Sequence, residues 1–171
     1  MDALGLIKTR RAIRRFKKET IATKWIELAL EAGRWSPSGI NNQPWRFMVL
    51  SGEEKNLIAE YTVYSYVVRG ADKVILVFLD KRESYHHDKD LMAIGACIQS
   101  ILLYVHSIDL GACWLGEILN KRKEIERLLG IPRHLELEAV IAVGKPAMAP
   151  KTGRRRPLDK LMVKPSKKKT R

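Results

Sequence analysis

The chain has 171 residues, of which 46% are hydrophobic and 30% are charged. This composition is typical of a soluble globular protein and excludes a disordered or fibrous chain, and the length suffices for one domain with a buried core. No apolar run reaches the roughly 18–20 residues of a membrane helix, and no apolar N-terminal stretch ends in small residues, so we expect neither a membrane span nor a secretory signal. The two cysteines, Cys97 and Cys113, match no metal-ligand or redox spacing, which favours a reducing, cytoplasmic location.

The net charge of +13 is unevenly distributed. Residues 151–171 contain ten Lys or Arg and a single acid, Asp159, and therefore carry +9 of it, while the rest of the chain carries only +4. A second basic cluster covers residues 10–18. Basic clusters of this kind indicate an anionic partner, a solvated arm, or both.

Apolar periodicity and turn residues predict alternating helices and strands. In chain order we expect helices or strands over 2–10 (helix), 23–35 (helix), 46–50 (strand), 53–61 (helix), 74–79 (strand), 90–107 (helix), 112–115 (strand), 120–129 (helix) and 137–143 (strand), with loops over 37–44 and 80–88. Asp2 and Thr23 are the expected N-caps of the first two helices. Residues 62–70 fit neither period.

Two of these segments indicate how the chain packs. The apolar run 74–79 is typical of a strand that is buried on both faces. The helix 90–107 is apolar almost all round, so it must lie centrally or at a subunit interface. Because the helices and strands alternate irregularly, we expect a mixed sheet surrounded by helices rather than a regular βαβ winding.

The first candidate site is the segment T-R-R-A-I-R-R-F over 9–16. Arginine forks match phosphate oxygens, and alternate side chains of an extended segment lie on one face. Arg10, Arg14 and Arg11 could therefore bind a phosphate. The alternative is a solvated basic stretch.

The second candidate is the loop W-S-P-S-G-I-N-N-Q-P-W-R-F over 35–47. Its amides, hydroxyl and carboxamides could bind the edge of a heterocycle, and the alternative is an ordinary turn. We expect Trp35 and Trp45 to be packing residues in either case.

Two weaker segments complete the set. In G-A-C-W-L-G over 111–116, glycine could admit a ligand close to the backbone or could simply end the preceding helix. The segment 151–157, with three successive arginines, could close on the same phosphate or form a disordered arm.

Several common signatures are missing from the sequence. It contains no glycine-rich phosphate loop, no G-x-S-x-G and no Cys/His arrangement for a covalent nucleophile. His86 and His87 with Asp88 and Asp90 could suggest a metal, but adjacent histidines in a polar loop are usually solvated, and we expect no metal site.

Taken together and in this order, the four segments resemble the FMN-dependent nitroreductase family. R-R-x-I-R-R-F, P-S-G-x-N-x-Q-P-W-R-F, G-x-x-W-L-G, and V-G-K-P before R-R-P-L match its pattern, from about residue 6 to 163. The resemblance implies an α+β fold with a mixed, largely antiparallel sheet and an intertwined homodimer that binds two FMN molecules at its interface. It implies one flavin-binding domain over 1–163, followed by a basic tail over 164–171.

The resemblance also implies which residues contact FMN. Arg10, Arg11 and Arg14 would bind the phosphate and ribityl chain, joined by Arg155 and Arg154, while Ala12 stands where many members have serine. Pro37, Ser38, Gly39 and Asn41 would come from the other subunit, and Trp114, Leu115 and Gly116 would lie along the flavin ring, with the amides of the last two aimed at its reactive edge. The segment between Leu50 and Val74 is short for the family, which leaves the flavin contacts of residues 61–72 undefined.

The implied activity is passage of a hydride from NAD(P)H through FMN to a nitroaromatic, a quinone or a similar small acceptor. The flavin carries the chemistry, so we expect no catalytic side chain and no metal. Two alternatives stay open: another flavin chemistry on the same fold, such as dehalogenation or flavin fragmentation, and a basic nucleic-acid-binding module. The tail could bind anions nonspecifically in either case.

Overall fold

The computed structural model describes residues 2–150 and 152–165. Four strands form one sheet in the order β1-β2-β4-β3, and every pair of neighbouring strands is antiparallel. The strands are β1 (Trp45–Ser51), β2 (Lys73–Asp80), β3 (Gly111–Leu115) and β4 (Leu135–Gly144). The helices are α1 (Ala3–Thr9), α2 (Thr23–Arg34), α3 (Gly52–Ala59), α4 (Ser65–Gly70), α5 (His87–Ser107) and α6 (Arg122–Leu128), with 3₁₀ turns η1 (Gly39–Asn41), η2 (Glu117–Lys121) and η3 (Leu158–Lys160).

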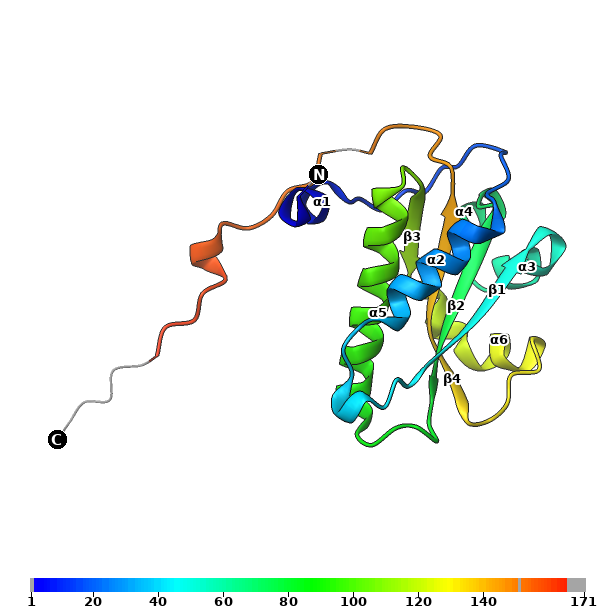
Figure 1. The fold of residues 1–171 in the computed structure, drawn as a ribbon. Helices are drawn as coiled ribbons and strands as arrows, with labels where there is room; N and C mark the ends of the chain where they lie inside the picture. Colours follow the sequence, from blue (N-terminus) through cyan, green and yellow to red (C-terminus); the bar gives the residue numbers. More distant parts are fainter. Residues whose placement is uncertain (1, 151, 166–171) are drawn as a thin grey trace.

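The sheet separates two hydrophobic cores (Figure 1). Helices α2 and α5 cover one face, and α3, α4 and α6 cover the other. Strand β2 shows why its apolar run is continuous: Ile75, Val77 and Leu79 face the first core, while Val74, Leu76 and Phe78 face the second. The prediction of a strand buried on both faces is confirmed, and so is the α+β class.

Helix α5 is the long helix of the first core. Its buried residues include Ile94, Cys97, Ile98, Ile101 and Val105, which pack against α2 and the sheet. Within the described chain it is the one helix whose length and hydropathy would suffice for a membrane span, although the apolar runs predicted none. Its place in the core accounts for that composition.

The structure differs from the expected boundaries in three places. Asp2 is an N-cap, because its carboxylate accepts a hydrogen bond from the Gly5 amide at 2.6 Å, but Thr23 is the first helical residue of α2 rather than its cap. The undefined segment 62–70 contains α4. The helix expected over 120–129 is instead η2 followed by α6.

The segment that follows β4 lies close to the N-terminal helix α1 before the chain leaves the globular body (Figure 1). Figure 1 shows the segment after β4 returning to α1 and then extending away as an arm. Residues 166–171, most of the predicted tail over 164–171, lie outside the described residues.

Candidate functional site

The N-terminal segment lies along the outer edge of β3. Ala12 forms a parallel bridge with Ala112, and the Ile13 amide donates to the Ala112 carbonyl at 2.9 Å. A Cβ atom at Gly111 would lie 2.8 Å from the Ile13 side chain. The close approach that this glycine permits is therefore made by the protein's own chain and not by a ligand. Because residues 12 and 13 are bonded to β3, the backbone positions of Arg11 and Arg14 on either side are fixed at this edge of the sheet.

A hollow of about 470 Å³, which we call the arginine hollow, lies between the two chain ends. Residues 10–15 line one side, and residues 148–150, 152, 153 and 155 line the other. Its charged lining residues are Arg10, Arg11, Arg14, Arg15 and Arg155, and no acidic residue lines it. Arginines more than 130 positions apart in the sequence thus converge on one space.

The electrostatics of this hollow favour an anion. The pKa of Arg10 is lowered by burial and then by the positive charges of Arg11 and Arg155. Among the described residues, no carboxylate forms an ion pair with any of the five arginines. Positive groups that repel one another without a counter-charge are stabilised by a bound anion, and a phosphate dianion suits guanidinium forks.

Arg11 contributes a buried donor without a partner. Its Nη1 donates to the carbonyls of Lys8 and Arg10 at 2.6 and 2.8 Å, while its buried Nε has no hydrogen-bond partner. It lies under Gly153, where a Cβ atom would be 2.5 Å from Nε. An orphaned guanidinium donor of this kind fits a phosphate ester such as that of FMN. The close contact with Gly153 was not anticipated, since a lone glycine in a basic segment gives no signal.

A second hollow of about 440 Å³ shares Arg14 and Arg15 with the first. It reaches Tyr66 and Gly70 on α4. Arg14 and Arg15 therefore border both hollows, and two residues of the segment 62–70 form part of the wall of the second.

The end of β3 exposes two of the three residues expected along the flavin ring. Trp114 and Gly116 are exposed, whereas Leu115 is buried in the second core. Neighbouring residues of a strand point their backbone groups to opposite sides. The backbone groups of Ala112 point away from β4, because its carbonyl accepts a hydrogen bond from Ile13. The backbone N–H of Trp114, two residues further on, therefore also points away from β4, whereas the N–H of Leu115 points toward β4.

The loop with Pro37, Ser38, Gly39 and Asn41 lies at the opposite end of α5. Near the start of α5, Asp90 accepts a hydrogen bond from Asn42 of this loop, and near its end, His106 bonds Thr9, which precedes Arg10. Asp90 and His106 are 16 positions apart in one helix, which corresponds to about 24 Å. One chain therefore does not bring this loop to the arginine hollow.

Three further sequence expectations can be compared with the structure. Trp45 is buried as predicted, but Trp35 is not a core residue: it is 76% exposed, and its indole N–H donates to Glu31 at 2.7 Å. Arg154 does not line the arginine hollow. Its contact with the site is through its backbone carbonyl, which accepts a hydrogen bond from the Arg155 side chain. Asp90, considered beside the histidines, has both carboxylate oxygens engaged by hydrogen bonds.

Comparison with known proteins assigns the family. The profile of the nitroreductase family matches residues 7–63 and 54–145, so the chain belongs to the nitroreductase family. A crystal structure from Desulfovibrio desulfuricans, solved in complex with FMN, is 42% identical and superimposes with a TM-score of 0.92 over 97% of this chain and 98% of that one.

Two curated relatives extend the comparison. A protein of Methanothermobacter thermautotrophicus, with the provisional name NADH dehydrogenase/NAD(P)H nitroreductase, is 36% identical over 155 residues, 89% of this chain and 81% of the relative. The iodotyrosine deiodinase of Thermotoga neapolitana is 29% identical over 167 residues, 82% of this chain and 87% of that protein.

Proposed function

We propose that this chain is an FMN-dependent NAD(P)H oxidoreductase. The family, the similarity to an FMN-bound structure and the arginine hollow all support this function. FMN, when bound, takes a hydride from NAD(P)H and passes electrons to a second substrate. The observation that carries the proposal is the convergence of Arg10, Arg11 and Arg155, without a carboxylate, on one hollow.

The chain's own residues bind and orient the flavin. Arg10, Arg11 and Arg155 would bind the phosphate, with Arg14 placed to reach the ribityl chain and Ala12 lying against it. Each charge-assisted hydrogen bond of this kind is worth roughly 1.5–3 kcal/mol. Arg154 would contribute by shaping the segment that carries Arg155.

The ring end of the flavin would lie beside β3. Trp114 and Gly116, exposed at the end of this strand, would border the ring, and outward backbone amides there would stabilise negative charge on a reduced flavin. Leu115 would support the site from the core beneath. No side chain needs to act as an acid or base, so we assign no catalytic residue.

We propose that the site is completed by a second copy of the chain. The loop with Pro37, Ser38, Gly39 and Asn41 is a helix length away from the hollow of its own chain, so it could reach only the flavin held by a partner subunit. Apolar side chains with no cover in one chain support a homodimer: Trp35, Ile40 and Met92 on the body, and Leu158, Leu161, Met162 and Val163 on the arm. Light scattering should report a dimer, and a chain truncated after residue 156 should dimerise more weakly; a stable FMN-bound monomer would contradict this arrangement.

We propose nitroaromatics, quinones and related small molecules as acceptors. The deiodinase relative keeps reductive dehalogenation as a second candidate activity. Assays of NADH and NADPH oxidation with a nitroaromatic, a quinone and an iodinated tyrosine would separate the two, since only a dehalogenase releases iodide.

The direct test is flavin binding by the purified protein. Added FMN should give the absorption spectrum of a bound flavin, and the complex should oxidise NADH or NADPH when an acceptor is present. A protein that neither binds FMN nor oxidises either nucleotide would overturn the proposal.

We also propose that residues 1–163 form the single flavin-binding domain and that the enzyme is cytoplasmic. Both cysteines are buried and free, as suits a reducing compartment. Nonspecific anion binding by residues 164–171 stays a prediction, and loss of salt-sensitive DNA retention on their deletion would test it.

A further inference from the structure

The loop over 38–43 has a backbone conformation that its residues disfavour. Ile40, Asn41 and Gln43 have φ of 49°, 58° and 46°, in the left-handed region. Glycine adopts this region readily and asparagine tolerates it, but for a β-branched isoleucine it is a strained conformation. Strain of this kind persists only where surrounding contacts hold the chain, and it is concentrated at ligand-binding sites.

One buried carboxylate holds the loop. Asp90 is fully buried at the start of α5, and its Oδ1 accepts from the Asn42 side-chain amide at 2.8 Å. The same Asn42 nitrogen donates to the Glu83 carbonyl at 2.8 Å. The Asn42 backbone amide donates to the Gly39 carbonyl at 3.0 Å, so the residue whose side chain is bonded to α5 also closes the strained turn through its backbone.

The other oxygen of Asp90 is fixed away from the loop. Oδ2 accepts from the Ser84 hydroxyl at 2.6 Å and from the amides of Tyr85 and His86 at 3.2 and 3.1 Å. Burial alone would raise the pKa of Asp90, but the hydrogen bonds from Ser84, Asn42 and the two amides lower it below its usual range. The carboxylate is therefore ionised at neutral pH, and both of its oxygens accept hydrogen bonds.

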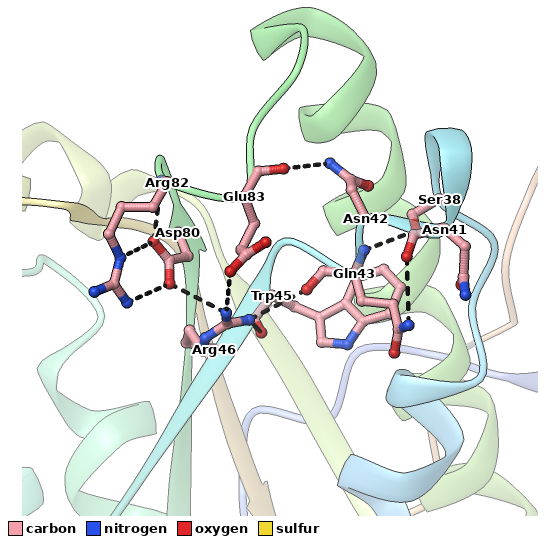
Figure 2. A network of polar contacts seen from close by, with 9 residues as sticks. All are labelled: Ser38, Asn41, Asn42, Gln43, Trp45, Arg46, Asp80, Arg82 and Glu83. Atoms are coloured by element: carbon pink, nitrogen blue, oxygen red, sulfur yellow. Dashed lines mark hydrogen bonds and ion pairs between the residues drawn. The ribbon is translucent and has the colours of Figure 1, made fainter.

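A separate network fixes the stem of the loop. Figure 2 shows Arg46, just after the loop, between the carboxylates of Asp80 and Glu83, at 3.1 and 3.6 Å. Arg82 donates to Asp80 from the other side, and the Asp80 amide donates to the Pro44 carbonyl at 2.8 Å. Arg46 also donates to the carbonyl of Gln43 at 3.2 Å, so this network holds residues 43–46, but none of its contacts reaches Ile40 or Asn41. Figure 2 shows the Asn42 side chain donating to the Glu83 carbonyl, in the segment before α5, and its contact with α5 itself is the hydrogen bond to Asp90.

We propose that Asp90 is a positioning residue for flavin binding. Through Asn42 it holds residues 38–43 in the conformation that presents Ser38, Gly39 and Asn41 to the flavin of the partner subunit. The inference rests on the proposed function, because the loop's place at the flavin is part of that proposal.

The chemistry of the contact defines the variants. In Asp90→Asn, one side of residue 90 becomes an amide N–H, and that N–H must face either the Asn42 amide or the donors on the other side. Asn42→Ala removes the connection and leaves the carboxylate. Ser84→Ala is the matched control, because it takes one hydrogen bond from the same carboxylate on the side away from the loop.

The experiment measures the Kd of each refolded or reconstituted apoprotein for FMN and for riboflavin, together with its thermal midpoint. Asp90→Asn and Asn42→Ala should each weaken FMN binding tenfold or more, and Ser84→Ala less than twofold. The double variant should bind no more weakly than Asn42→Ala alone, because both changes break one connection. Riboflavin lacks the phosphate, so its affinity should fall by the same factor as that of FMN.

Several results would overturn the inference. They are wild-type FMN affinity in Asn42→Ala, an additive double variant, or equal losses of affinity in Asp90→Asn and Ser84→Ala. If Asp90→Asn does not fold, Asn42→Ala and Asn42→Asp decide, because the latter sets two carboxylates against each other and should weaken flavin binding further. Failure of the wild-type protein to bind FMN would instead refute the proposed function.

Discussion

Replacing Arg155 by alanine tests whether the two chain ends bind one phosphate. Arg155 is exposed, and its described hydrogen bond goes to the carbonyl of its neighbour Arg154, so its loss removes no packing from the fold. Its charge lowers the pKa of Arg10, so in the protein without FMN the substitution relieves repulsion. The thermal midpoint of the apoprotein should therefore stay the same or rise slightly.

With FMN bound, the same substitution removes one charge-assisted hydrogen bond to a dianion. A loss of roughly 1.5–3 kcal/mol corresponds to a Kd about 10- to 150-fold weaker. Because Arg155 is exposed to solvent, the effect should fall toward the lower figure at physiological salt, where the Debye length is about 8 Å, and grow at low salt.

The assay is titration of apoprotein with FMN, followed by flavin fluorescence at two salt concentrations. Arg156→Ala is the matched control, because Arg156 is the next residue, is equally basic and does not line the arginine hollow. Riboflavin should bind Arg155→Ala as it binds the wild-type protein. Equal losses of FMN affinity in the two variants would show that only net charge matters, and an unchanged Arg155→Ala would remove this residue from the site.

Three further predictions concern the fold. Gly33→Ala should destabilise the protein by about 1–3 kcal/mol in chemical denaturation, because the new Cβ would lie 2.8 Å from the Ile101 side chain. Hydrogen bonds from Arg82 lower the pKa of Asp80 to about 2, so the stability that its ionised form provides should be lost as the pH falls from about 4 to 2, and Asp80→Asn should flatten that part of the stability curve. Burial raises the pKa of Glu138 to about 6, so as the pH is lowered the folded protein takes up a proton at Glu138 before the unfolded chain does. The free energy of unfolding should therefore fall as the pH rises from about 4.5 to 6, and an unchanged slope in Glu138→Gln would refute this.

Local sequence patterns predicted most of the secondary structure. The apolar runs of β2 and β4 identified both strands because each is buried on two faces, and the length of α5 followed from its nearly uniform apolar character. The short helix α4 could not be predicted, because six residues are less than two turns and show no period. The prediction that Trp35 packs in the core is wrong. Large aromatic side chains are usually buried, whereas the ring of Trp35 lies at the surface beside Arg34.

The site was predictable in its components but not in its geometry. Sequence similarity indicated the arginines at both ends, yet only the bridge between Ala12 and Ala112 and the return of the chain after β4 bring them together. The contact between Asn42 and Asp90 joins residues 48 positions apart, and no local pattern encodes it. The left-handed conformation of Ile40 runs against its own preference, so local propensity predicts the opposite.

The length of α5 has a genetic consequence if each flavin is shared between subunits. A chain that lacks Arg155 keeps a sound loop, and a chain with a damaged loop keeps its arginines. In a mixed dimer of the two, one site receives both defects and the other receives none. Two chains that each bind FMN weakly as homodimers should therefore regain wild-type affinity at about half of the flavin sites in the mixed dimers they form.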